Sequence, residues 1–181
     1  MIRGPLPRAL DGRVMDAAQE HQRIDRFTDA HVAFLRTRDQ LRAVVDSRLA
    51  GVLADVLYDH VLAREWSAWR EDDFQTYIEQ VHRDLIGELN LVPVRMQMIV
   101  RKMIDEQWLL SYASSEGIRA RLGTMSERLS RRLERPMSLA ITGQQLADMY
   151  AQIADDFAQL WPDLKAYVSR QRAASQERLA S

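Results

Sequence analysis

The stretch GVLADVLYDHVLAREW, from Gly51 to Trp66, decides the fold class of this chain. Apolar residues occupy most of its helical circumference, a pattern typical of a helix buried at the centre of a protein. Helical periodicity continues on both sides, strand-like alternation is almost absent, and glycines and prolines fall mostly where helices should begin or end. We therefore predict an all-α protein built around this segment.

The flanking sequence predicts a bundle of about six or seven helices. Before the central segment we expect two helical stretches, whose stripe residues are Val14, Ala17, Ala18, His21, Ile24 and Asp25 in the first and Leu41, Val44, Val45, Arg48 and Leu49 in the second. After it, we expect Asp72 or Asp73 to cap a helix over 74–89, and Pro93 to start a helix that reaches about Tyr112. Ser114 or Ser115 should cap a further helix that Pro136 stops. Pro162 should kink or divide a last long helix, whose stripe residues are Leu146, Met149, Tyr150, Ile153, Phe157 and Leu160.

Composition limits both the architecture and the chemistry. With 181 residues and 46% apolar side chains, the chain can bury one sizeable core, so we expect a single domain over 1–181 with a fraying polar tail over 170–181. The absence of cysteine excludes disulfides, thiolate metal sites and thiol nucleophiles. The net charge of −1 gives no general attraction to nucleic acid or anionic membrane. Without an apolar leader or a membrane-length apolar run, we expect a cytoplasmic protein that binds neither.

The central segment carries charged groups where charge is costly. Asp55 and Asp59 lie four residues apart on one helix face, and His60 follows directly. An unpaired buried carboxylate costs several kcal/mol, on the order of a large fraction of a domain's stability, so these groups are paired, solvent-facing or metal-bound. From the sequence pattern alone, Asp55 and Asp59 could equally be ordinary salt-bridged helix residues, solvent-facing residues or metal ligands.

A second pair at the same spacing suggests a shared site. His21 and Asp25 are four residues apart on the first expected helix, and the two helices could bring both pairs to one ion. Imidazole and carboxylate donors suit Mn²⁺, Fe²⁺ or Mg²⁺. Glu79 and His82 form a single Glu-x-x-His, whereas a di-iron bundle needs two such motifs with further glutamates. We interpret the remaining aromatic candidates as packing residues, namely Trp66, Trp69, Trp108 and Trp161.

Three consecutive blocks carry a family resemblance. HQRIDRFTDAH (His21 to His31), GVLADVLYDHVLAREW (Gly51 to Trp66) and DEQWLLSYASSEGIRARLGTMSERLSRR (Asp105 to Arg132) resemble the bacterial acyl carrier protein phosphodiesterases in order and spacing. That family is regarded as an unusual all-helical branch of the HD-type metal-dependent phosphohydrolases. Its members remove the 4′-phosphopantetheine arm from holo acyl carrier protein and prefer Mn²⁺.

The resemblance implies a fold, a reaction and a set of site residues. We expect an HD-phosphohydrolase-like bundle that hydrolyses the diester with Mn²⁺ or another hard divalent metal. Asp25 and Asp59 are the expected catalytic residues, and the same two with His21 and His60 are the expected metal ligands or the groups that orient them. Weaker candidates are Asp29, His31 and Asp55.

One departure concerns the start of the chain. Family members begin with a further short histidine-containing helix and a Gly-x-x-x-Ala-Asp segment, whose trailing end would match Arg3 and Gly4 here. That upstream Asp is regarded as essential. We therefore expect this chain to lack one metal-facing carboxylate and to have reduced activity.

An arginine-rich helix supplies a candidate partner surface. Between Gly117 and Pro136 six arginines face two glutamates, and acyl carrier proteins are strongly acidic. We predict that this helix docks holo acyl carrier protein; a solvated helix face with internal ion pairs explains the pattern equally well. The arginines assigned to docking are Arg119, Arg121, Arg128, Arg131 and Arg132.

Two other functions remain compatible with the sequence. A degenerate relative would bind a carrier protein without taking up metal or turning over. An HD-like phosphohydrolase acting on a small nucleotide would need no arginine-rich docking helix.

Overall fold

The computed structural model describes residues 12–179. Over that range the chain forms nine α-helices and one 3-10 turn and has no strand, which confirms the all-α fold. The count exceeds six or seven because two of the helices are single short turns. The elements are α1 (Gly12–Ala30), α2 (Val32–Leu41), α3 (Ala50–Arg64), α4 (Trp66–Trp69), α5 (Phe74–Gly87), η1 (Leu89–Leu91), α6 (Val94–Asp105), α7 (Trp108–Ser111), α8 (Ser115–Leu133) and α9 (Gly143–Leu179).

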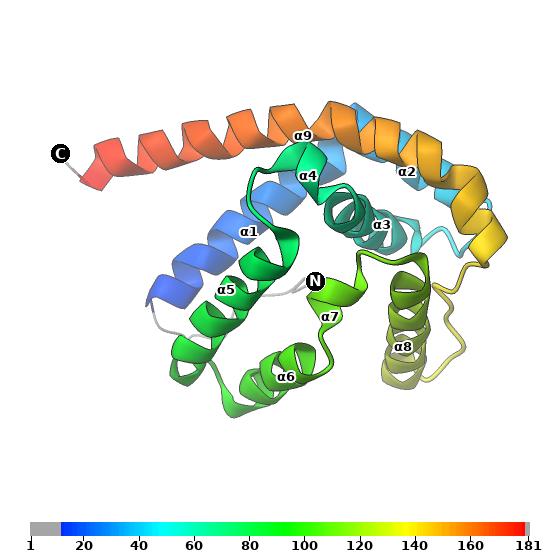
Figure 1. Ribbon diagram of the computed structural model, residues 1–181, viewed down its shortest axis with the longest axis horizontal. Coiled ribbons are helices and arrows are strands. Elements are labelled where there is room, and N and C mark those ends of the chain that lie inside the picture. Colours follow the sequence, from blue (N-terminus) through cyan, green and yellow to red (C-terminus); the bar gives the residue numbers. More distant parts are fainter. Residues whose placement is uncertain (1–11, 180–181) are drawn as a thin grey trace.

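The core lies where α2, α3 and α9 pack together (Figure 1). The central helix α3 is buried on most sides, as its apolar circumference predicts, and its Leu53 and Val61 are fully buried. Phe34 of α2 and Ile153 of α9 complete this centre. Full burial of each such side chain contributes roughly 1.5–3 kcal/mol, so these three helices form the rigid frame of the molecule.

Three predicted helix starts are confirmed. The Asp73 side chain accepts a hydrogen bond from the Thr76 backbone N–H at the start of α5. Ser114 caps α8 in the same way through the Gly117 N–H, and Pro93 precedes α6. These caps supply acceptors or fixed backbone angles at helix ends, where N–H groups have no partner within the helix.

The predicted helix through Leu41 to Leu49 is wrong beyond Leu41. The chain turns over 42–49 because the Asp46 carboxylate accepts hydrogen bonds from the backbone N–H and the guanidinium of Arg48. Such a local side-chain bond offers the backbone an alternative to the helical ladder. The helix expected to reach Tyr112 is also divided, because Gln107 adopts a left-handed conformation with φ of 50° between α6 and α7.

The last helix is the longest element. α9 continues through Pro162 as one helix whose axis curves around the core in Figure 1, and its helical backbone reaches Leu179 within the tail that we expected to fray. No helix among residues 12–179 combines the length and the apolar character that crossing a membrane requires.

Candidate functional site

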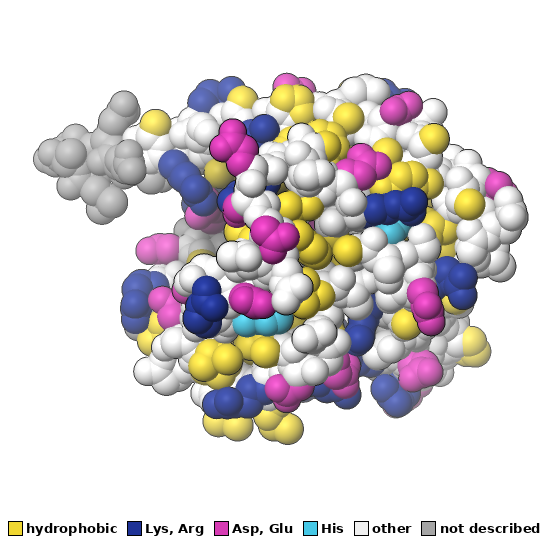
Figure 2. Space-filling view, in the orientation of Figure 1, with side chains coloured by type: hydrophobic (Ala, Val, Ile, Leu, Met, Phe, Trp, Pro, Cys, Tyr) yellow, Lys and Arg dark blue, Asp and Glu magenta, His cyan; other side chains and the backbone are white. Residues whose placement is uncertain are grey.

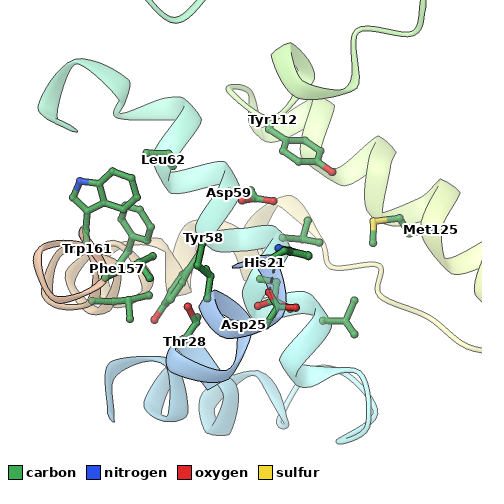
Figure 3. Close-up of a pocket in the computed structure, with 16 residues that line it drawn as sticks. His21, Asp25, Thr28, Tyr58, Asp59, Leu62, Tyr112, Met125, Phe157 and Trp161 are labelled. Atoms are coloured by element: carbon green, nitrogen blue, oxygen red, sulfur yellow. Dashed lines mark ion pairs between the residues drawn. The ribbon is translucent and has the colours of Figure 1, made fainter. Parts of the chain in front are cut away.

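A cavity of about 390 Å³ lies against α1, α3 and α9. Tyr112, which follows α7, and Met125 of α8 form its far side (Figure 3). The cavity has a polar side on α1 and α3 and an apolar side on α3 and α9. Its lining residues are His21, Ile24, Asp25, Thr28, Val52, Asp55, Val56, Tyr58, Asp59, Leu62, Tyr112, Met125, Phe157, Leu160, Trp161 and Leu164.

The two predicted helical pairs meet at this cavity. His21 and Asp25 reach it from α1, one helical turn apart, and the distance from His21 Nδ1 to Asp25 Oδ1 is 3.6 Å. Asp55 and Asp59 reach it from α3 at the same spacing. The spacing of four residues places each pair on one face of its helix, so the sequence identified which groups the fold gathers here.

Asp59 has the most unusual electrostatic environment of the four. It projects from α3 into the space between His21 and Tyr112, where its side chain keeps exposed surface because it faces the cavity (Figure 3). Protein surrounds the carboxyl on most sides, and this burial raises its pKa from 3.8 to about 6. No residue among those described forms an ion pair or a hydrogen bond with it. A cation bound in the cavity would relieve this desolvation.

His60 lies outside the cavity, although it follows Asp59 directly. Consecutive residues of a helix point about 100° apart, and here Tyr58 and Asp59 line the cavity whereas His60 points away from it. His60 is fully buried, its Nδ1 is 2.5 Å from the Tyr112 carbonyl oxygen, and burial lowers its pKa. A neutral imidazole that donates from Nδ1 holds the backbone of Tyr112, so His60 is placed to orient the cavity wall.

Tyr112 is a cavity residue that the sequence reasoning did not single out. It stands in one of the quoted motif blocks, but nothing in its spacing connects it to His21 or Asp59. Its side chain extends toward the cavity from the end of α7 (Figure 3). Burial, and next the negative charge of Asp59, raise the pKa of the Tyr112 hydroxyl, which therefore stays protonated at neutral pH.

The apolar side of the cavity comes mainly from α9. Trp161, which we interpreted as a packing residue, stacks on Phe157 with ring centroids 5.5 Å apart, and both rings also line the cavity. Leu164 extends the same wall by one helical turn. A ligand bound here would therefore meet charged groups on one side and a flat aromatic surface on the other.

The weaker candidates lie elsewhere. His31 caps α2 by accepting the Ala33 N–H at Nδ1, and its Nε2 lies 3.2 Å from the Asp163 carboxylate. Asp29 does not line the cavity. His31 therefore has a structural role, and of the weaker candidates Asp55 alone faces the cavity.

The arginine-rich helix α8 is only partly available to a partner. Arg121 is bound to the Glu106 carboxylate at 3.1 Å, and the guanidinium groups of Arg121 and Arg128 lie over the Trp108 ring. Arg119, Arg131 and Arg132 are exposed.

The residues of the cavity were compared with what a metal ion requires. Within residues 12–179, no three His, Asp or Glu side chains are grouped closely enough to hold a metal ion. The cavity nevertheless presents one imidazole and three carboxylates, which are donors suited to a hard divalent cation. The raised pKa of Asp59 indicates a carboxylate that lacks a compensating charge. The predicted match of Arg3 and Gly4 lies outside the described residues.

The fold and the cavity define an all-α protein with a cavity lined by one imidazole and three carboxylates. Comparison with known families then specifies it: the acyl carrier protein phosphodiesterase family model matches residues 1–164, and the chain belongs to that family.

The chain is similar to curated proteins named acyl carrier protein phosphodiesterase. One from Escherichia coli O157:H7 (strain EC4115) is 28% identical over 170 residues, covering 93% of this chain and 86% of the relative. One from Pectobacterium atrosepticum is 27% identical over 178 residues, covering 94% and 86%. One from Yersinia enterocolitica is 31% identical over 124 residues, covering 68% and 61%. No solved structure matches the chain.

Proposed function

We propose that this protein hydrolyses the phosphodiester that joins 4′-phosphopantetheine to the serine of holo acyl carrier protein, leaving the apo carrier. The cavity carries the proposal because it sets carboxylates and an imidazole opposite an apolar aromatic wall. The substrate offers both kinds of group, with a charged diester at one end of an arm that carries dimethyl and methylene groups between its amides. Family membership supports the choice of substrate, and such a substrate implies a cytoplasmic enzyme.

We propose Mn²⁺ as the cofactor, with His21, Asp25, Asp55 and Asp59 as the residues that would hold it. Such a cation supplies two things when bound: it lowers the pKa of water and neutralises charge on the phosphoryl oxygens. The chain's own contribution is to present one imidazole and three carboxylates to the cavity from α1 and α3. His60 acts from outside the cavity through the Tyr112 backbone, consistent with an orienting rather than a ligating role.

Tyr112 is the proposed proton donor to the leaving group. Attack of water on phosphorus breaks the bond between phosphorus and the serine oxygen, and the departing alkoxide needs a proton. A hydroxyl that burial keeps protonated at neutral pH can supply it. The proton lost by the attacking water goes to a carboxylate oxygen of the cavity, for which Asp59, with its pKa raised to about 6, is suited.

The apolar wall of α9 is proposed to hold the pantetheine arm. The indole of Trp161 and the ring of Phe157 offer a surface for the arm's dimethyl and methylene groups. Burying these groups orients the arm and excludes water beside the diester.

The direct test incubates the purified protein with holo acyl carrier protein and follows the intact mass of the carrier. Loss of the mass of the arm with added Mn²⁺, and no loss after chelation, is the expected result. Asp155→Asn, at an exposed position of α9, is the matched control for substitutions in the cavity. Carrier binding without any mass change would indicate a non-catalytic relative, and turnover of a nucleotide panel alone would indicate a small-nucleotide phosphohydrolase.

A further inference from the structure

The helix α6 exposes apolar side chains in a way that a solvated surface helix does not require. Val94 is 71% exposed, Met98 is 67% exposed and Ile99 is 51% exposed. Ile86, near the end of α5, is 51% exposed. Among the described residues, six large apolar side chains are exposed, and these four lie on α5 and α6. Exposed apolar side chains that gather in one region are typical of interaction sites.

Cationic residues share this exposed face. Val94 and Met98 are one helical turn apart, as are Arg95 and Ile99, and Arg101 and Lys102 follow on the same side. The α6 helix carries three cations and one anion in a chain whose net charge is −1. Lys102 lies 3.3 Å from the Glu106 carboxylate, so Arg95 and Arg101 give this face its charge. Figure 2 shows apolar and cationic side chains next to one another at the lower edge of the molecule, over α6.

We propose that this α6 surface, made of Ile86, Val94, Met98 and Ile99 with Arg95 and Arg101, docks the acidic acyl carrier protein. The inference rests on the proposed function and gives its partner a place on the molecule. An acidic helical partner fits because carboxylates can meet the cations at the rim while apolar side chains pack at the centre.

Other occupants fit the surface less well. A second copy of the chain, related by a two-fold axis, would present the same positively charged face to this one, which is repulsive. A membrane-binding helix depends on a continuous buried apolar face, whereas α6 exposes three large apolar side chains separated by charges.

The structure favours α6 over the arginine-rich α8 for this role. Arg121 is already paired with Glu106, and Arg128 lies over Trp108, so two of the five predicted docking arginines have partners within the chain. Within the described range, α8 exposes one large apolar side chain, Leu133, at its last residue. Charge without an apolar centre steers encounter but adds little to affinity.

The α6 surface is also connected to the cavity wall. Glu106, which follows α6, accepts hydrogen bonds from the Trp108 indole N–H and from Arg121. Trp108 begins α7, and the next residue after α7 is Tyr112, which lines the cavity. A carrier bound on α6 therefore contacts the segment that leads to the site of its own arm.

The test compares three double variants of the full chain. Val94→Ser with Met98→Ser removes the apolar centre, Arg95→Glu with Arg101→Glu reverses the charge, and Arg131→Glu with Arg132→Glu is the matched control on α8. All six positions are exposed, and circular dichroism checks that each variant keeps its helices. Binding of apo acyl carrier protein is measured by calorimetry, independently of hydrolysis, and turnover is measured on the holo carrier and on bis(p-nitrophenyl) phosphate.

Both α6 variants should weaken carrier binding by about tenfold or more, with the charge variant most affected at low salt, while the α8 control changes by less than about threefold. Hydrolysis of bis(p-nitrophenyl) phosphate should be unchanged. Equal carrier binding by wild type and α6 variants, or an equal loss in the α8 control, overturns the docking site. Loss in the α6 variants of self-association, or of binding to phosphatidylglycerol vesicles, with carrier binding retained, overturns it in favour of another occupant. Absence of wild-type turnover with carrier binding intact would instead count against the proposed function alone.

Discussion

Asp59 and Asp156 are both carboxylates set among the packed helices α3 and α9, yet the protein treats them in opposite ways. Asp156 is fully buried, and its Oδ1 accepts from Arg36 Nη2 at 2.6 Å and Nε at 3.0 Å. Its Oδ2 accepts from the Thr37 hydroxyl at 2.9 Å, so Tyr58 donates to Thr37 in turn. Asp59, by contrast, has protein around it and no described partner, and burial raises its pKa.

Asp156 is thus a carboxylate that stabilises the fold, whereas Asp59 is a carboxylate that the fold leaves accessible to a bound ligand. Desolvation of Asp156 is offset by a guanidinium and a hydroxyl supplied by α2. Desolvation of Asp59 is not offset, and an uncompensated carboxylate at a cavity is typical of a functional position. Removing each group should therefore have different consequences for stability and for activity.

The largest expected effect is the loss of activity in Asp59→Asn. The substitution removes the negative charge at the centre of the proposed site and should lower turnover of holo carrier by about a thousandfold while weakening Mn²⁺ binding in calorimetry. Helical content should not change. Wild-type turnover and metal affinity in this variant would remove Asp59 from the site.

Asp156→Ala should have the largest effect on stability. It leaves Thr37 and the Arg36 guanidinium without their acceptor, and the free energy of unfolding should fall by about 3 kcal/mol in urea titrations. The control is Asp155→Ala, whose side chain is exposed, and it should change stability by less than about 0.5 kcal/mol. Equal losses in both variants would show that the buried network has no special role.

Tyr112→Phe should affect catalysis while leaving the cavity intact. Removal of the hydroxyl takes away the proposed proton donor, so kcat should fall by about a hundredfold with little change in KM. A diester with a thiolate or phenolate leaving group, which needs no proton, should be hydrolysed by this variant at nearly the wild-type rate. A uniform loss on every substrate would point to a structural role for the hydroxyl.

The smallest expected effect is a gain of stability in metal-free Asp59→Asn. The pKa of Asp59 is about 6 in the folded protein and 3.8 for an ordinary aspartate, so protonation of Asp59 favours the fold. The folded protein therefore loses stability as the pH rises from about 4 through about 6. At pH 7.5 the variant should be more stable than wild type by about 1–2 kcal/mol, a figure reduced because the carboxylate keeps contact with cavity solvent.

This gain should vanish as the pH falls to about 4, and saturating Mn²⁺ should reverse the order of the two proteins at pH 7.5. Thermal unfolding at several pH values, with and without the cation, measures both effects. A variant that is less stable than wild type at neutral pH without metal would contradict the contrast between Asp59 and Asp156.

Sequence alone was sufficient for the elements whose signals are local. The apolar circumference of α3, the Asp73 and Ser114 caps and the spacing of four residues in the polar pairs each depend on neighbours in the chain. The turn over 42–49 was missed because its apolar spacing is helical, and one side-chain bond from Asp46 competes with that pattern.

The features that sequence could not supply depend on distant partners. The neutralisation of Asp156 needs Arg36, 120 positions away. The place of Tyr112 depends on how α7 returns to α3. The position of His60 outside the cavity also could not be read from helix geometry, because neighbours in sequence such as Tyr58 and Asp59 both line it. The exposed residues of α6 were visible as a mixture of apolar and cationic side chains, but their exposure required the packing of α5, α6 and α7.

Gly117 shows how little tolerance this arrangement leaves. A methyl group at this position would overlap the Ser111 carbonyl, because the end of α7 approaches the first turn of α8 backbone to backbone. A helix taken alone prefers alanine to glycine by about 1 kcal/mol. Gly117→Ala would therefore favour the helix locally but displace Ser111, the residue next to Tyr112. Through Tyr112, this substitution on α8 would change the shape of the cavity.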